Sequence, residues 1–365
     1  MAKLRGTVAW SATLGVALLI AATSAVAQQP ASFDARFADL IKAAKAEGQV
    51  TWYQGVLEQG GTGFATHFQN RFGIKVNHQF MPSGPIYERF RTESASKQNI
   101  ADVFSSGDAG PMLAAMKAGY IAKYDTASKS LYPKGWVYDQ PNATAYPTQR
   151  VQMAVAYNTR LMKPDDVKVL ATWKSLLDPK FADGKLALGD PTRSLTAFSL
   201  YFYMLRVNEA AYGRAFLDKL AAQKPVVYSS HTQEGARIAA GEVPIGVIVD
   251  IIAINQYDLG APIAIIYPSP TPVILQHTGI SSNAPHPNAA KLFLEYITSE
   301  EGLTEWKKSS GGLTGLPSVD AARGLKYTSE PWYREPKEFF IAEDGTRDMQ
   351  EEYKRFAPIW KEVFK

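Results

Sequence analysis

The stretch from Val243 to Asp258 constrains the fold more than any other part of the chain. Residues 243–249 are apolar except for Gly246, which favours a strand covered on both faces within a mostly parallel sheet. Asp250 ends this run, and ligands of open α/β sheets bind beyond the carboxyl ends of the strands. Asp250 is therefore a candidate ligand contact. The alternative is that it caps the next helix while Ile251 and Ile252 fill core.

The rest of the chain alternates between helix and strand patterns, which predicts a parallel sheet with crossover helices. Helices are expected over Phe33–Glu47, roughly Gly63–Phe72, about Pro111–Gly119, Thr196–Arg206 and Asn288–Thr298, with two more over 347–356 and 358–364. Strands are expected over Gln49–Tyr53, Gly73–Phe80, Ala101–Phe104, Val151–Tyr157, Leu186–Leu188, Val226–Tyr228 and Ile263–Tyr267. The stretch Tyr132–Pro147 is predicted to be irregular surface.

Length and charge limit the class of protein. With 365 residues, 46% of them hydrophobic, the chain is expected to form two domains rather than one. The formal charge of +4 falls to +2 without Lys3 and Arg5. Basic residues form no long run and no aromatic-interleaved patch, so no nucleic-acid partner is predicted.

The first 27 residues have the pattern of a secretory signal. Lys3 and Arg5 precede an apolar segment, and Ala25-Val26-Ala27 precedes Gln28 as an A-x-A cleavage site. The apolar segment is shorter than the roughly 20 residues that span a bilayer, which argues against a membrane anchor. The signal predicts an exported protein. Because the chain contains no Cys, we expect this protein to have neither disulfides nor a lipid attached through cysteine.

Two loops predict anion or polar-ligand sites at helix N-termini. Ser106 and Asp108 follow the Ala101–Phe104 strand, where they either bind a ligand or simply cap a helix. Thr192, Arg193 and Ser194 follow the Leu186–Leu188 strand, and the Arg193 guanidinium is suited to bidentate binding of a carboxylate or phosphate. The alternative for Arg193 is a surface ion pair of little energetic value.

The sequence lacks the usual signatures of an enzyme or a resident metal. It has no G-x-S-x-G, no H-E-x-x-H, no CxxC and no phosphate-binding Gly-Lys loop. The five histidines include no pair at metal-binding helical spacing. We therefore predict a non-enzymatic protein without a cofactor or metal.

Several short segments along the mature chain form a recognisable set. They are Gly73–Val76, Ala101–Phe104, Ala118–Ile121, Val155–Thr159, Asp190–Thr192, Gly241–Gly246, Gly260–Pro262 and Pro287–Glu295. Together, and in this order, these segments resemble the type II periplasmic solute-binding proteins of ABC importers, in the branch that includes ferric-ion-binding proteins.

This resemblance implies two doubly wound α/β lobes joined by a crossing-strand hinge and closing on a solute. Residues 28–149 and 268–311 would form lobe 1, and residues 150–267 and 312–365 lobe 2. The protein would be a periplasmic monomer that delivers its solute to an inner-membrane ABC permease. The resemblance brings the marked loops together around the solute: Gln54, Ser83, Ser106 and Asp108 from one lobe, Thr192, Arg193, Ser194 and Asp250 from the other.

The ligand is where the chain departs from the family. Iron-binding relatives carry two adjacent tyrosines where this chain has Ile251 and Ile252, and isoleucine cannot ligate Fe(III). We therefore expect a small organic anion, such as a carboxylate, phosphonate or sugar phosphate, with ferric iron as the alternative. A second alternative is an amino-bearing or polyamine-like solute bound by Asp250, with Trp52, Tyr53 or Tyr267 supplying cation–π contacts or only core packing. The alternative classes of function are a periplasmic sensor input, which uses the same architecture, and a secreted enzyme.

Overall fold

The structure is a computed structural model that describes residues 32–55, 57–193, 195–322, 329–334, 336–341 and 349–364. The predicted signal, residues 1–27, lies outside the described residues. Residues up to Arg36 and residues 37–365 form two separate units, and the first of these contains only α1 (Phe33–Arg36) among its described elements. No helix in the described ranges is both long and apolar enough to span a membrane.

The strands of the larger unit form a mixed sheet in the order β2-β1-β3-β10-β5-β8-β6-β7. Their bounds are β1 (Gln49–Gly55), β2 (Lys75–Phe80), β3 (Val103–Ser106), β4 (Tyr138–Gln140), β5 (Ala143–Asn158), β6 (Leu186–Gly189), β7 (Val226–Tyr228), β8 (Ile245–Val249), β9 (Ile263–Ile266), β10 (Thr271–Ile280), β11 (Leu313–Thr314) and β12 (Phe339–Ile341).

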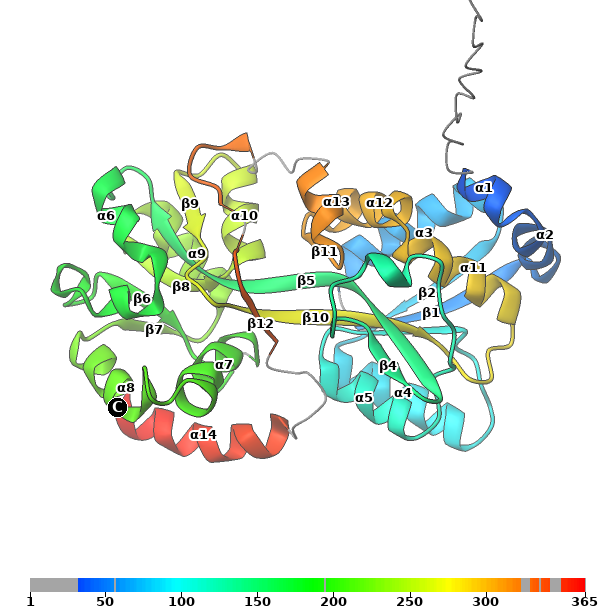
Figure 1. The fold of residues 1–365 in the computed structure, drawn as a ribbon, viewed down its shortest axis with the longest axis horizontal. Coiled ribbons are helices and arrows are strands. Elements are labelled where there is room, and N and C mark those ends of the chain that lie inside the picture. Colours follow the sequence, from blue (N-terminus) through cyan, green and yellow to red (C-terminus); the bar gives the residue numbers. More distant parts are fainter. Residues whose placement is uncertain are drawn as a thin grey trace, which may run out of the picture. The chain divides into compact units, whose positions relative to one another are not determined.

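Two groups of parallel strands lie on either side of one antiparallel pair. We call β2, β1 and β3 the first strand group, and β8, β6 and β7 the second strand group. The long strands β5 and β10 pair with each other and extend from one group to the other (Figure 1). This is the mixed α/β architecture with crossing strands that the sequence resemblance implies.

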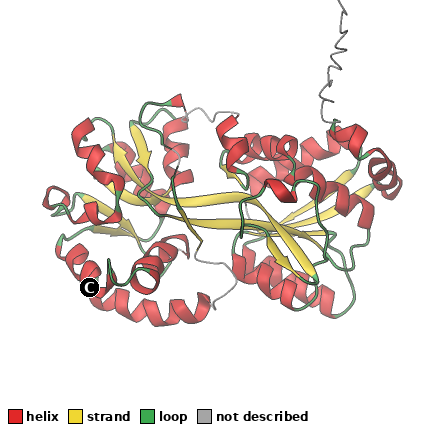
Figure 2. Ribbon diagram, in the orientation of Figure 1, coloured by secondary structure: helices red, strands yellow, loops and turns green. Residues whose placement is uncertain are grey.

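Helices flank the strands of both groups (Figure 2). Their bounds are α2 (Ala38–Glu47), α3 (Glu58–Phe72), α4 (Ser83–Ala95), α5 (Ala109–Lys117), α6 (Pro164–Lys168), α7 (Leu195–Phe202), α8 (Gly213–Ala222), α9 (His231–Ala240), α10 (Asp250–Asp258), α11 (Pro287–Thr298), α12 (Glu300–Ser310), α13 (Pro317–Ala322) and α14 (Met349–Val363). Short 3₁₀ segments cover Lys129–Leu131, Val169–Ala171, Trp173–Leu177 and Pro179–Phe181, and a π-helical turn covers Tyr203–Val207.

The β8 strand confirms the prediction from its apolar run. All five residues of Ile245–Val249 are buried, because α9 contacts the strand on one side and α7 contacts it as well. Gly246 is required for close packing here. A Cβ at this position would lie 2.6 Å from the Ile238 side chain and 2.9 Å from a Glu234 carboxylate oxygen.

Three expectations about individual elements are wrong. The stretch predicted as irregular surface contains β4 and the start of β5. Every residue of β5 is buried, and at this end the strand pairs with β4 and β10. The two predicted C-terminal helices are one helix, α14, which continues through Pro358 since Phe356 and Trp360 are buried in the core beside it. The first predicted helix is divided at Phe37, whose φ of −115° and ψ of 22° are not helical.

Candidate functional site

The carboxyl ends of both strand groups meet the middle of the crossing pair. Ser106, the last residue of β3, lies opposite His277 of β10, which in turn pairs with Pro147 of β5. Val249, the last residue of β8, lies opposite Met153 of β5. Residues Thr148–Gln152 of β5 therefore lie between the two groups, and we call this segment the junction. The loop after β3 and helix α10, which follows β8 directly, begin beside it.

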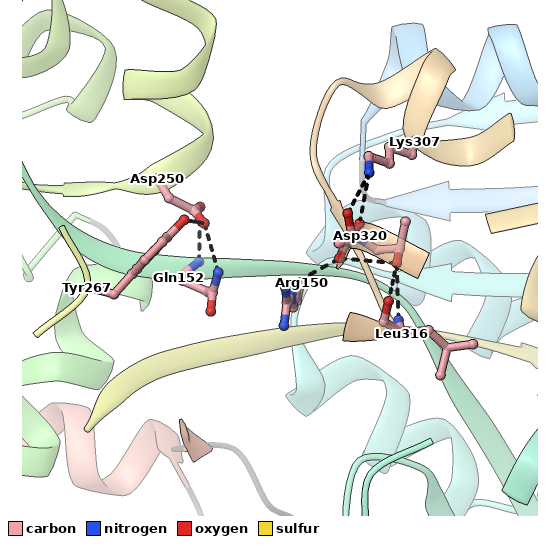
Figure 3. Close-up of polar contacts among 8 residues, drawn as sticks. Arg150, Gln152, Asp250, Tyr267, Lys307, Leu316 and Asp320 are labelled. Carbon is pink, nitrogen blue, oxygen red and sulfur yellow. Dashed lines mark hydrogen bonds and ion pairs between the residues drawn. The ribbon is translucent and has the colours of Figure 1, made fainter. Parts of the chain in front are cut away.

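Asp250 connects the second strand group to the junction (Figure 3). Its carboxylate accepts hydrogen bonds from the backbone N–H of Gln152 at 3.1 Å, from the Gln152 Nε2 at 3.2 Å and from the Tyr267 hydroxyl at 3.1 Å. It also accepts one from the backbone N–H of Ile251 at 2.8 Å. Because β8 pairs with β5 only from Met153 onward, the carboxylate takes the place of a strand neighbour at Gln152.

Burial makes this carboxylate unusual. Asp250 is 1% exposed. Desolvation raises its pKa from 3.8 to about 6, although the hydrogen bonds from Gln152, Tyr267 and Ile251 act in the opposite direction. Its oxygens already have four donors, so the arrangement suits a group that positions α10 against β5. Whether Asp250 also contacts a solute stays a prediction.

Ile251 and Ile252 lie in the first turn of α10 and have different surroundings. A Cβ on Gly312, the residue before β11, would lie 3.4 Å from the Ile251 side chain and 2.9 Å from the Gln149 Nε2. Ile251 thus lies near the junction. Ile252 packs against α9 instead, since a Cβ on Gly235 would lie only 2.7 Å from its side chain.

The predicted residues of the first strand group lie at the ends of β1 and β3. Gln54 is fully buried, and its Nε2 donates to the Leu57 carbonyl at 3.1 Å. The Ser106 hydroxyl donates to the Asp108 carbonyl at 2.6 Å and accepts from the Asp108 N–H at 3.2 Å. Ser83 begins α4, although its side chain lies outside what the structure describes. Their contact with a solute stays a prediction.

Thr192 and Arg193 lie in the loop after β6, and Ser194 lies outside the described residues. The Asp190 carboxylate accepts from the Thr192 N–H and hydroxyl, at 2.8 and 2.7 Å. Arg193 is 67% exposed and pairs with Asp190 at 3.7 Å. Both line a surface cavity of about 520 Å³ together with Tyr353 and Lys361 of α14. The structure thus brings these two residues together with α14, while Asp250 lies by the junction.

The aromatic candidates for cation–π contacts have partners within the protein. The Trp52 indole N–H donates to the Ser105 hydroxyl at 2.8 Å, and its ring packs among Phe64, Phe293 and Trp306. The Arg89 guanidinium lies 4.6 Å from the centre of the Tyr53 ring. Tyr267 donates to Asp250, as described above. Core packing and internal polar contacts thus account for the positions of all three rings.

Sequence reasoning missed the polar side chains of the junction itself. Gln149 and Gln152 are 3% and 0% exposed, and Arg150 is 1% exposed. Arg150 pairs with Asp320 at 3.3 Å, and Asp320 also pairs with Lys307 at 3.6 Å and accepts from the Thr314 N–H at 3.1 Å (Figure 3). The sequence feature that could have indicated these residues is the polar run Thr148-Gln149-Arg150, which lies next to a run of strand-forming residues.

Acidic and histidine side chains do not gather into a metal site in the described ranges. No group of three or more His, Cys, Asp or Glu residues there is placed to hold a metal ion. The fully buried Glu234 pairs with His231 at 2.9 Å beside β6 and β8, and burial raises its pKa.

Comparison with known proteins supports the fold that these elements form. The structure of an iron- and citrate-bound protein from Trichodesmium (IdiA, FutA) matches with a TM-score of 0.69 and 17% identity over 87% of this chain and 99% of that one. AfuA from Actinobacillus pleuropneumoniae, with fructose-6-phosphate bound, matches with a TM-score of 0.62 and 19% identity over 86% and 99%. The substrate-binding protein of an ABC transporter from Agrobacterium tumefaciens matches with a TM-score of 0.65 and 19% identity over 87% and 94%.

The family comparison extends over most of the chain. The family model for the bacterial extracellular solute-binding proteins matches residues 63–339, which include β2 and β3, the second strand group, the crossing pair and α10. Members of this family are solute carriers of transporters rather than enzymes. The chain belongs to the family of bacterial extracellular solute-binding proteins, the solute-binding components of ABC transporters.

Proposed function

We propose that this protein captures a small organic anion at the junction and delivers it to an ABC permease of the inner membrane. Residues 28–149 with 268–311, and residues 150–267 with 312–365, would form the two lobes that close on the solute. This division assigns α12 to the first lobe and both β11 and α13 to the second, although α12 contacts both of them. The boundary after residue 311 is therefore the one to test first. The protein would act as a periplasmic monomer without enzymatic activity, after removal of residues 1–27.

The observation that carries the anion proposal is that each strand group has helix N-termini along the edge that faces the junction. Each helix α4, α5, α7, α9 and α10 follows the carboxyl end of a parallel strand, and α3 follows β1. Helix N-termini carry unpaired N–H groups and the positive end of the helix dipole. A small anion is the ligand class that this edge favours. One structural neighbour contains fructose-6-phosphate and another contains iron together with citrate, so both hold an organic anion on this fold.

Ferric iron is the weaker alternative because of the first turn of α10. If Ile251 and Ile252 correspond to the tyrosine pair of iron-binding relatives, the chain places two hydrocarbon side chains where hard anionic oxygen ligands are needed. Asp250, the nearest carboxylate, already accepts four hydrogen bonds.

Titration separates the two ligand classes. We expect calorimetry of the ligand-free protein to detect stoichiometric binding of at least one carboxylate, phosphonate or sugar phosphate. We expect Fe(III) to produce no visible charge-transfer band. Stoichiometric Fe(III) binding with such a band, and no binding of any organic anion, would reject the proposal.

A further inference from the structure

Two buried glutamines at the junction have amide oxygens that need a hydrogen-bond donor. The Oε1 atoms of Gln149 and Gln152 are inaccessible to solvent and have no hydrogen-bond partner in the described structure. A buried amide oxygen without a donor is costly, so native proteins rarely retain one without a reason. Both residues belong to the strand that connects the two strand groups.

The orientation of the Gln152 amide follows from Asp250. A carboxylate can only accept, so the Gln152 group that lies 3.2 Å from it must be the Nε2 donor. The Oε1 atom is then held as an acceptor on the other side of the amide (Figure 3). What meets it must donate a hydrogen bond, which excludes an ionised carboxylate or phosphate oxygen at this point.

Gln149 lies near Ile251, the residue that follows Asp250. Its Nε2 and the Ile251 side chain both lie within 3.4 Å of the point where a Cβ on Gly312 would stand, and Ile251 directly follows Asp250. The lack of a side chain at Gly312 leaves this space to the Gln149 amide. The Gln149 amide is therefore close to Ile251, and the Gln152 amide is bonded to Asp250 next to it in the sequence.

We propose that Gln149 and Gln152 bind hydroxyl groups of the solute, which makes the solute a hydroxylated organic anion. This inference rests on the proposed function, because it names which anions the junction accepts. A hydroxyl group donates to a fixed amide oxygen and can also accept, so it matches both glutamines. An ammonium group fits less well, since the carboxylates that contact the junction already have partners. Asp250 has four donors, and Asp320 pairs with Arg150 and Lys307.

Pairs of probes with equal charge test this directly by calorimetry. Glycerol phosphate is compared with propyl phosphate, and glycerate with propionate. Aminopropyl phosphate, whose ammonium group offsets part of the phosphate charge, is a separate probe for the amino-bearing alternative. We expect the hydroxylated member of a pair to bind roughly tenfold more tightly, the usual value of one neutral hydrogen bond. Equal binding within each pair, or tighter binding of aminopropyl phosphate, would overturn the hydroxyl inference while leaving anion capture intact. Failure of every probe to bind would reject the proposed function and this inference with it.

Substitutions of single glutamines test which residues cause the preference for hydroxylated probes. In Gln152→Met the ratio of the affinities for the hydroxylated and the non-hydroxylated probe is expected to fall to near one. The affinity for propyl phosphate or propionate is expected to stay unchanged. Gln149→Met provides a second variant should loss of the Gln152–Asp250 bond impair folding. Gln223→Met is the matched control: Gln223 is also buried with an Oε1 that lacks a partner, but it ends α8 and bonds the Leu176 carbonyl. An equal loss of preference in the control, or an equal loss of affinity for all probes in Gln152→Met, would contradict the assignment.

Discussion

Asp320→Ala is expected to lower the free energy of unfolding by about 3–5 kcal/mol, the usual cost of removing one partner from a buried ion pair. The Asp320 side chain is 1% exposed, and its carboxylate lies within 3.3 Å of the Arg150 guanidinium. Without it, Arg150 would keep a buried positive charge with no compensating anion from α13. Urea unfolding followed by circular dichroism measures the loss.

The reason for the large effect is that one carboxylate holds three segments together. It binds Arg150 of β5 and Lys307 of α12, and it accepts from the N–H of Thr314 in β11. An exposed ion pair provides the control. Asp165 and Lys168 are 90% and 77% exposed, so Asp165→Ala should change stability by less than about 0.5 kcal/mol. Similar losses in the two variants would show that Asp320 has no special role.

Asp250→Ala is expected to destabilise the protein by about 3 kcal/mol, because four donors would lose their common acceptor. Asp250→Asn should cost much less, since an asparagine oxygen can still accept from the N–H groups of Gln152 and Ile251. Its amide nitrogen can donate to the Gln152 Oε1 once that amide turns over. Unfolding free energies of the three proteins at neutral pH test this order.

The wild type and Asp250→Asn together also test the raised pKa of Asp250. Because its pKa in the fold is about 6, above the ordinary 3.8, the folded protein binds the proton more strongly than the unfolded chain does. The proton-linked part of the contribution of Asp250 to stability is therefore greatest below pH 3.8 and is lost as the pH rises to about 6, while its hydrogen bonds continue to contribute. The stability of the wild type relative to Asp250→Asn should fall across this window. A constant difference would contradict the raised pKa.

The sequence predicted the elements whose pattern is local. The apolar run of β8 and the alternation of helix and strand over the first third of the chain required only the periodicity of buried positions. The family resemblance supplied the crossing strands. Pro358 misled the prediction of α14, because the packing of Phe356 and Trp360 outweighs the loss of one backbone hydrogen bond.

The junction could not be predicted in the same way, because its chemistry depends on contacts between distant segments. Asp250 and Gln152 are 98 residues apart in the sequence. Polar side chains in a strand ordinarily indicate an exposed face, yet Gln149, Arg150 and Gln152 are all buried. Only the pairing of β5 with β8, β10 and β11 shows why.

Native mass spectrometry of freshly purified, exported protein tests the central claim most directly. A solute captured in the cell remains bound under gentle conditions and is released on denaturation, so its mass and charge class are measured together. We predict a single bound organic anion that carries hydroxyl groups. A mass increase equal to one iron atom, or a bound organic cation, would contradict the account.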